Sequence, residues 1–207
     1  MISNLTQALA DLHPRLREAI LSVSEVQEIP AHTEILREGQ YVKVIPIVLD
    51  GLLKVFTRYE DKELLLYYIQ PRQSCVMSFT AGLNDERSRV FAQTEAPTTA
   101  LLLPAGQISG WLRDFPQLTT LFFQQYSLRY DDLLSTVHQV LFDAMDQRLY
   151  TYLKEKASLM GNPLVLSHRQ IAHDLGTARE VVSRVMKKLV AEGKVQQHAH
   201  CIKILPW

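Results

Sequence analysis

The sequence predicts an α+β protein with three successive parts. These are a β-rich N-terminal domain (1–115), one long helix (116–145) and a small C-terminal domain of helices closed by a β-hairpin (146–207). Three observations support this order. Short apolar runs separated by turn residues fill about 25–104. A stripe of apolar residues at helical spacing follows, and two short helical segments joined at a glycine come after it.

Composition places the chain among ordinary globular proteins. Its hydrophobic residues make up 47% and its charged residues 21%, so a packed core is expected. No apolar run approaches the roughly 20 residues needed to cross a bilayer, and the first residues lack the pattern of a secretory signal. The two cysteines, Cys75 and Cys201, lie far apart, as is typical of a reducing compartment. We therefore expect a cytoplasmic protein without a membrane partner.

The charge is distributed unevenly although the net charge is zero. Residues 147–207 hold ten Lys or Arg and four Asp or Glu, which gives +6, and residues 1–146 carry −6. A basic C-terminal part favours a polyanionic partner for that part.

The first domain is predicted to begin with a helix over about Asn4–Val23. Asp50-Gly51 lies between two apolar runs and predicts a hairpin, because its turn requires a positive φ. Six short strands at this spacing are typical of a β-roll or jelly-roll. The predicted strands are Glu34–Leu36, Ile45–Leu49, Leu52–Thr57, Leu64–Ile69, Val90–Thr94 and Thr99–Leu103.

The long helix carries apolar residues spaced by fours and threes from Leu118 to Ala144. A small barrel cannot cover the whole stripe of a helix this long, so the stripe favours a partner helix in a homodimer. The alternative is a core helix packed within one chain. The predicted dimer contacts are Phe122, Tyr126, Tyr130, Leu133, Val137 and Val140.

The C-terminal domain has the signals of a winged helix-turn-helix. A helix over Asp146–Met160 ends at Gly161. Ser167 with Gln170 forms a capping-box pattern for the next helix. Gly176 then stands where a tight turn between helices needs a left-handed residue. The second helix of the motif, Ala178–Ala191, turns four apolar residues inward: Val182, Val185, Met186 and Leu189.

The opposite face of that second helix is polar and basic. An arginine donates two hydrogen bonds to guanine, and a glutamate accepts one from cytosine, so this face suits the major groove of DNA. Alternatively, Glu180 and Arg184 form a helix-stabilising pair at i,i+4. After Gly193, Lys194–Gln197 and Cys201–Leu205 predict a hairpin wing with His198 and His200 at its tip, placed to contact phosphate. The polar face comprises Arg179, Glu180, Ser183, Arg184, Lys187 and Lys188.

The run Leu175-Gly-Thr-Ala-Arg-Glu-Val-Val-Ser-Arg resembles the signature of Crp/Fnr transcription regulators. The order of β-roll, long helix, connecting helix and winged domain is similar to that family over nearly the whole chain. Three segments are most similar to the branch found in Bacteroidetes-type bacteria: Arg37-Glu-Gly-Gln-Tyr, Gly51-Leu-Leu-Lys-Val-Phe and Ser74-Cys-Val-Met-Ser-Phe.

The resemblance implies a homodimer on a pseudo-palindromic site in double-stranded DNA, with an RNA polymerase contact if the protein activates transcription. Its base readers fall on Arg179, Glu180, Ser183 and Arg184. Its phosphate contacts fall on Ser167, Arg169 and Thr177, to which we add the basic residues Lys187, Lys188, His198 and His200.

The resemblance also bears on a small effector. Members that bind cyclic AMP carry a Gly-Glu-Leu run and then an Arg-Ser pair; this chain has Arg87-Ser88 but no Gly or carboxylate in 74–79. Cyclic AMP is therefore not expected as the effector, and no cofactor is predicted. Two cysteines are also too few for an iron–sulfur cluster. The candidate effector residues are Met77, Ser78, Arg87, Ser88 and Arg89.

The sequence also bears on two other classes of function. A jelly-roll metalloenzyme needs paired histidines and a carboxylate on neighbouring strands, and the β segment contains only His32, so the protein is not expected to be an enzyme. The second alternative is a cyclic-nucleotide- or anion-binding module that acts on a protein partner without touching DNA; the predicted helix-turn-helix argues against it.

Overall fold

The computed structural model describes residues 2–60, 62–142, 144–198 and 201–205, without the side chains of 2, 3 and 138–142. The chain divides into two compact units. Unit 1 comprises residues 1–57 and 66–133, and unit 2 comprises residues 58–65 and 134–207. The long helix α5 (Gln117–Phe142) contributes to both.

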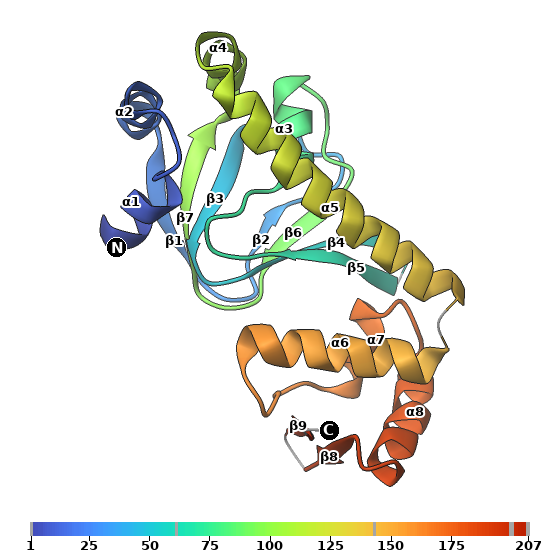
Figure 1. Ribbon diagram of the computed structural model, residues 1–207. Helices are drawn as coiled ribbons and strands as arrows, with labels where there is room; N and C mark the ends of the chain where they lie inside the picture. The colour runs from blue at the N-terminus through green and yellow to red at the C-terminus, as the bar shows by residue number, and fades with distance from the viewer. Residues whose placement is uncertain (1, 61, 143, 199–200, 206–207) are drawn as a thin grey trace. The chain divides into compact units, whose positions relative to one another are not determined.

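Unit 1 is built on two antiparallel sheets (Figure 1). One has the order β1-β7-β3 and the other has the order β2-β6-β4-β5. The strand β5 begins in the segment assigned to unit 2 and ends in unit 1. Strands distant in sequence are paired, so neither sheet is a simple meander. The strands are β1 (Glu25–Ile29), β2 (Glu34–Leu36), β3 (Val44–Asp50), β4 (Leu53–Tyr59), β5 (Lys62–Ile69), β6 (Phe91–Thr94) and β7 (Thr98–Pro104).

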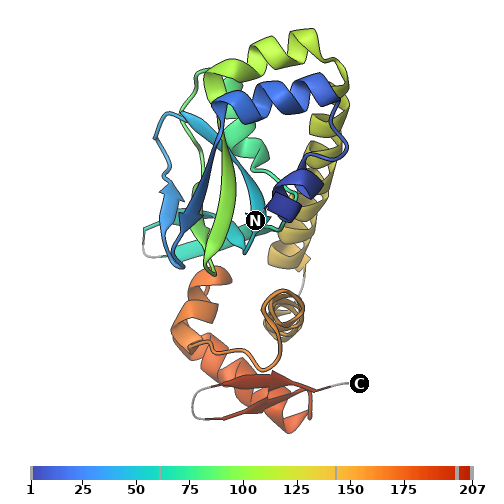
Figure 2. The same cartoon turned by 90° about the vertical axis from the view of Figure 1, so that its left-hand side faces the viewer.

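Helices surround these sheets, and α2 and α4 lie at the same end of them (Figure 2). Side chains from both sheets and the helices form one core, in which Val48, Leu53, Ile69 and Leu101 are almost completely buried. The helices are α1 (Ile2–Ala8), α2 (Pro14–Val23), α3 (Val76–Leu83), the 3-10 turn η1 (Ala105–Gln107), α4 (Ile108–Asp114) and the first part of α5.

The predicted fold class, an α+β protein with an N-terminal β domain, a long helix and a C-terminal helix-turn-helix, is confirmed. The predicted hairpin at Asp50-Gly51 is wrong. Gly51 has the expected positive φ of 94°, but the strands on its two sides belong to different sheets. A Cβ at Gly51 would lie 2.5 Å from the carbonyl oxygen of Pro97, so the glycine also permits a close approach of two backbones.

The single N-terminal helix predicted over 4–23 is two helices. The chain leaves the helical conformation between Ala8 and Pro14, and His13 caps the second helix by accepting a hydrogen bond from the amide of Arg15. A proline at the first helical position lacks only an N–H that would be unpaired there, which favours a new start at Pro14. Sequence analysis also missed the strand β1 and the helix α3.

Unit 2 contains a three-helix core and a hairpin, and the β8–β9 hairpin lies beside α8 (Figure 2). The predicted termination at Gly161 is confirmed, since it caps α6 with a φ of 93°. The elements are α6 (Met145–Met160), α7 (His168–Asp174), α8 (Arg179–Ala191), β8 (Val195–Gln197) and β9 (Ile202–Ile204).

A buried ion pair joins α6 to α7 inside this unit. The Asp174 carboxylate accepts a hydrogen bond of 2.6 Å from the Tyr152 hydroxyl and one of 3.1 Å from the Lys156 ammonium. Lys156 and Asp174 are only 2% and 4% exposed. A charge this deeply buried is tolerated only with a partner, so each residue requires the other.

Replacing one member of this pair should destabilise unit 2. Asp174→Ala leaves the Lys156 ammonium buried without its carboxylate, at a cost of roughly 3–5 kcal/mol in the free energy of unfolding. Urea denaturation followed by circular dichroism measures it. The double variant Lys156→Met with Asp174→Leu should recover most of the loss. The control is Lys203→Met on the exposed side of β9; an equal effect of Asp174→Ala and Lys203→Met would contradict the assignment.

Candidate nucleic-acid interface

The first helix of the motif, α7, begins at the predicted capping box. The Ser167 hydroxyl accepts a hydrogen bond of 3.2 Å from the Gln170 amide, and the Gln170 side chain accepts one of 2.8 Å from the Ser167 amide. Two backbone donors at the helix start are thereby satisfied, which fixes where α7 begins. The prediction of this cap is confirmed.

The turn between α7 and α8 depends on Gly176, which has a φ of 63°. Beyond it, the Thr177 amide donates to the Ala172 carbonyl over 2.9 Å and closes the turn. The helix α8 then buries the four predicted apolar residues, which confirms its inward face. They are Val182, Val185, Met186 and Leu189.

The outward face of α8 carries charged side chains. Arg179, Glu180, Arg184 and Lys187 are exposed, and Arg179 and Glu180 stand in the first turn of the helix. Both basic and acidic groups are thus available over about two turns of an exposed helix. Ser183, also predicted as a base reader, is only half-exposed.

Ser183 is held by a histidine that sequence analysis did not identify. The His168 Nδ1 lies 2.8 Å from the Ser183 hydroxyl, and its Nε2 lies 3.0 Å from the Gln197 side-chain nitrogen. Because an amide nitrogen donates, Nε2 accepts and Nδ1–H donates to Ser183. Burial, and then the positive charge of Arg179, lower the pKa of His168. The neutral ring therefore connects α7, α8 and β8.

Lys188 is also engaged within the unit. Its ammonium forms an ion pair with Asp146 at the start of α6, and it lies 3.8 Å from Glu192. The hydrogen bond between Lys188 and Asp146 lowers the pKa of Asp146 and raises the pKa of Lys188. Lys188 is accordingly less suited to phosphate than the exposed Lys187.

The remaining predicted phosphate contacts lie around the motif. Ser167 and Arg169 are exposed at the start of α7, and Thr177 is half-buried in the turn. On the wing, His198 is exposed, and its amide donates to the Cys201 carbonyl. His200 falls outside the described residues.

The five candidate effector residues do not form one cradle. Met77 packs against the core of unit 1, and Ser78 is buried in α3. Ser88 is 3% exposed, and its hydroxyl both donates to and accepts from the backbone of Val90, so it points into its own chain. A phosphate-binding role for Ser88 would require these bonds to break.

The two arginines of that group lie beside a shallow hollow of about 520 Å³. Arg87 is exposed and stacks on the Tyr41 ring, 5.3 Å from its centre, and Arg89 lies 3.8 Å from Glu86. Glu38, Asp85 and Glu86 also line the hollow, so carboxylates as well as guanidinium groups surround it.

Unit 1 holds a buried arginine that the sequence analysis missed. Arg129 on α5 is 6% exposed and donates to the Tyr68 carbonyl, the Gln73 side chain and the Asp132 carboxylate over 2.7–2.8 Å. It also lies 4.9 Å from the centre of the Tyr67 ring. Burial and the neighbouring Cys75 raise the pKa of Tyr67. The sequence held one signal for this site, because Arg129 stands among the apolar residues that recur at helical spacing along α5.

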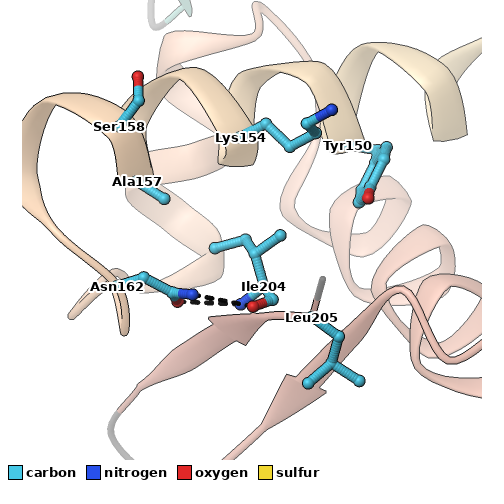
Figure 3. A pocket seen from close by; sticks show the side chains of 7 residues that line it. All are labelled: Tyr150, Lys154, Ala157, Ser158, Asn162, Ile204 and Leu205. Atoms are coloured by element: carbon cyan, nitrogen blue, oxygen red, sulfur yellow. Dashed lines mark hydrogen bonds between the residues drawn. The ribbon is translucent and has the colours of Figure 1, made fainter. Parts of the chain in front are cut away.

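An open hollow of about 790 Å³ lies between α6 and the end of β9 (Figure 3). The Asn162 side chain closes one end of it by two hydrogen bonds with the backbone of Ile204, of 2.8 and 3.0 Å. Tyr150 lines it, and its ring has the ammonium groups of Lys154 and Lys194 within 5.6 Å of its centre. The Asn162 hydrogen bonds join β9 to the segment that follows α6, and the Lys194–Tyr150 contact joins the start of the hairpin to α6 itself.

Comparisons with known proteins agree with this geometry. Residues 147–207 match the family described as a Crp-like helix-turn-helix domain. No curated protein matches the sequence.

Solved structures match over nearly the full length. A transcriptional regulator assigned to the Crp/Fnr family from Eubacterium rectale is 23% identical, with a TM-score of 0.86 over 98% of this chain and 95% of that one. The c-di-GMP-responsive regulator CLP of Xanthomonas campestris is 19% identical, with a TM-score of 0.80 over 92% and 98%. A Crp/Fnr-family regulator from Thermus thermophilus is 20% identical, with a TM-score of 0.76 over 88% and 94%. The chain therefore has the fold of Crp/Fnr regulators.

Within the described parts of the chain, no helix combines the length and hydropathy required to cross a membrane.

The neutral His168 should make stability depend on pH. Its pKa lies below the ordinary value of 6.5 in the folded protein, so the unfolded chain takes up the proton first as the pH falls through that value. The folded state loses stability in that window. His168→Gln should therefore lose less stability than the wild type between about pH 7.5 and about pH 5.5.

Thermal or urea unfolding at several pH values measures this difference. His198→Gln, on the exposed wing, is the matched control and should follow the wild type. The same loss in wild type and His168→Gln would show that His168 does not carry the effect.

Proposed function

We propose that the protein is a sequence-specific DNA-binding transcription regulator of the Crp/Fnr type that acts in the cytoplasm as a homodimer on a pseudo-palindromic operator. The observation that carries the proposal is the exposed, charged face of α8. This helix follows the capped helix α7 and the turn at Gly176. The match of 147–207 to the Crp-like helix-turn-helix family supports it. The likeness to the Bacteroidetes-type branch rests on the three short segments quoted above.

On this proposal, Arg179, Glu180 and Arg184 read base edges in the major groove. They lie on the exposed side of α8, and their side chains offer donors to guanine and an acceptor to cytosine. Ser183 contributes to this face only through the hydroxyl that His168 orients.

Phosphate contacts are assigned to the exposed Arg169 and Lys187, to the Ser167 and Thr177 groups at the two ends of α7, and to His198 on the wing. These contacts set position and affinity rather than sequence preference. Lys188 is also assigned to this group, where DNA phosphate would compete with Asp146 for its ammonium.

The homodimer is proposed to form through α5. Five large apolar side chains on this helix are 50% exposed or more, and they follow the spacing 3, 4, 4, 3 of a helix–helix seam. Four of the six predicted contacts, Tyr126, Tyr130, Val137 and the half-buried Leu133, lie on or beside this seam. The five side chains are Phe123, Tyr126, Tyr130, Leu134 and Val137.

Phe122 and Val140 are the other two predicted contacts. Phe122 stacks on Phe79, with ring centres 3.2 Å apart, so it belongs to the core of its own chain, and Phe123 takes its place in the seam. The side chain of Val140 falls outside the described residues.

The effector is proposed not to be cyclic AMP. Ser88 is committed to its own backbone, and carboxylates lie among the residues around Arg87 and would repel an anion. If the protein activates transcription, it would also contact RNA polymerase.

Base readers and phosphate anchors should respond differently to substitution. Arg179→Ala or Glu180→Ala should weaken binding to the selected site by roughly 1–3 kcal/mol and relax the preference at one base pair. Arg169→Ala should weaken binding to all sequences and reduce the salt dependence by about one unit of slope. Selection of sites from random DNA, followed by titration of single-base variants at several salt concentrations, measures both. An unchanged ranking of variants with Glu180→Ala would contradict the assigned face.

The seam can be tested with two matched leucines on α5. Leu134 is 50% exposed on the seam, and Leu128 is 49% exposed but is turned about 160° away from the middle of the seam around the helix. Leu134→Asp should shift the protein to monomer and strongly weaken operator binding, since two half-sites about 34 Å apart would no longer be engaged together. Leu128→Asp should remain a dimer. Light scattering at micromolar concentration distinguishes these outcomes, and a monomeric wild type would refute the seam.

A further inference from the structure

A cavity of about 400 Å³ lies in unit 1, apart from the candidate effector residues. Its wall is formed by residues of α1, α2, β3, α3, β7, α4 and α5 and of the loops that follow α1 and β5, including Leu9, Ile47, Trp111 and Leu121. This volume falls within the range of small-molecule sites in proteins. Apolar side chains facing empty space lose dispersion contacts that a guest of matching shape restores.

The polar groups around the cavity are mostly engaged already. Arg72 and Asp11 pair with each other at 3.3 Å, and both are well exposed. The Gln73 side-chain oxygen accepts hydrogen bonds from the Gln70 amide and from Arg129, and the Ser74 hydroxyl donates to the Pro46 carbonyl. A ligand therefore finds little charge to pair with here.

Gln125 on α5 is different. It lines the cavity, and its side-chain oxygen is buried without a hydrogen-bond partner among the described residues. A buried acceptor without a donor costs free energy, so a ligand that supplies a donor gains what the protein alone lacks.

We propose that this cavity is a binding site for a small uncharged molecule with an apolar body and one hydroxyl group, which hydrogen-bonds to Gln125. A net charge is disfavoured, because the apolar wall offers no counter-ion and the Arg72–Asp11 pair is already neutral. The binding site stands independently of the proposed DNA function.

The site is connected to α5 in two ways. Gln125 is itself an α5 residue, and Gln73 on the cavity wall accepts a hydrogen bond of 2.7 Å from the buried Arg129, one turn further along the helix. A ligand that moves Gln73 changes the support of Arg129. Its effect on transcription, but not its binding, rests on the proposed function.

Straight-chain alcohols are suitable probes, and Trp111 is a built-in reporter because it lines the cavity. In a Trp207→Phe background, titration of the full chain without DNA with 1-butanol, 1-hexanol and 1-octanol should change Trp111 fluorescence saturably. Affinity should rise about fourfold for each added CH₂ until the cavity is filled. Octanoate, which has the same tail with a charge, should bind at least about tenfold more weakly than 1-octanol.

Variants locate the site. Ala8→Phe and Leu121→Phe fill the cavity from different walls and should abolish the response, whereas Ala10→Phe, on an exposed neighbour outside the lining, should leave it unchanged. Gln125→Leu should weaken 1-octanol binding at least about fivefold, and Gln124→Leu, at the exposed rim, should not. Circular dichroism verifies that each variant is folded.

The outcomes separate this proposal from the DNA-binding one. Arg179→Ala should bind 1-octanol like the wild type even though it binds its selected DNA site more weakly. The absence of a saturable response to any alcohol would overturn the proposal, as would a response that survives in both folded cavity-filling variants.

Discussion

The buried carboxylate of Asp174 is the interaction on which the C-terminal unit depends. It ends α7, immediately before the turn at Gly176, and two α6 side chains, Tyr152 and Lys156, hold it in place. A buried charge with two hydrogen-bond donors has one favourable position, so the end of α7 is fixed against α6. The direction in which α8 leaves the turn follows from that position. The orientation of the outer face of α8 thus depends on a contact that is buried inside the unit.

The same requirement for partners decides which basic groups remain available to DNA. The excess of positive charge in residues 147–207 includes Lys156, which is consumed in the core, and Lys188, which is held by Asp146. Arg169, Arg179 and Lys187 are exposed, and no ion-pair partner for them is found within the described residues. Net charge therefore indicates that this part of the chain suits a polyanion, while the internal ion pairs define which side chains can meet it.

Local signals in the sequence predicted the helix-turn-helix well, because the cap at Ser167 and the left-handed turn at Gly176 are each decided within a few residues. These local signals did not predict which strands pair, because strand pairing depends on residues far apart in the sequence. Gly51 has the conformation of a hairpin turn, but the pairing of its flanking strands is set by distant β6 and β7. The His168–Ser183 contact was missed for the same reason, since it joins two helices across the turn. Phe122 and Phe123 are neighbours on one helix, so the sequence alone does not reveal that Phe122 stacks on Phe79 within its own chain.

The long helix α5 packs one face on the core of unit 1 and exposes a row of apolar side chains on another. Arg129 helps to fix which residues lie on each face. An apolar side chain at this position would extend the core, but a guanidinium at 6% exposure must be satisfied, and Tyr68, Gln73 and Asp132 each provide an acceptor. These bonds fix the rotation of α5 about its own axis relative to the sheets of unit 1. Rotation of a helix determines which side chains it presents on each of its faces, because neighbouring positions differ by about 100°. The exposed row from Phe123 to Val137 lies about 100° around the helix from Arg129, so a change at Gln73 would alter the orientation of this row through rotation of α5 rather than through direct contact.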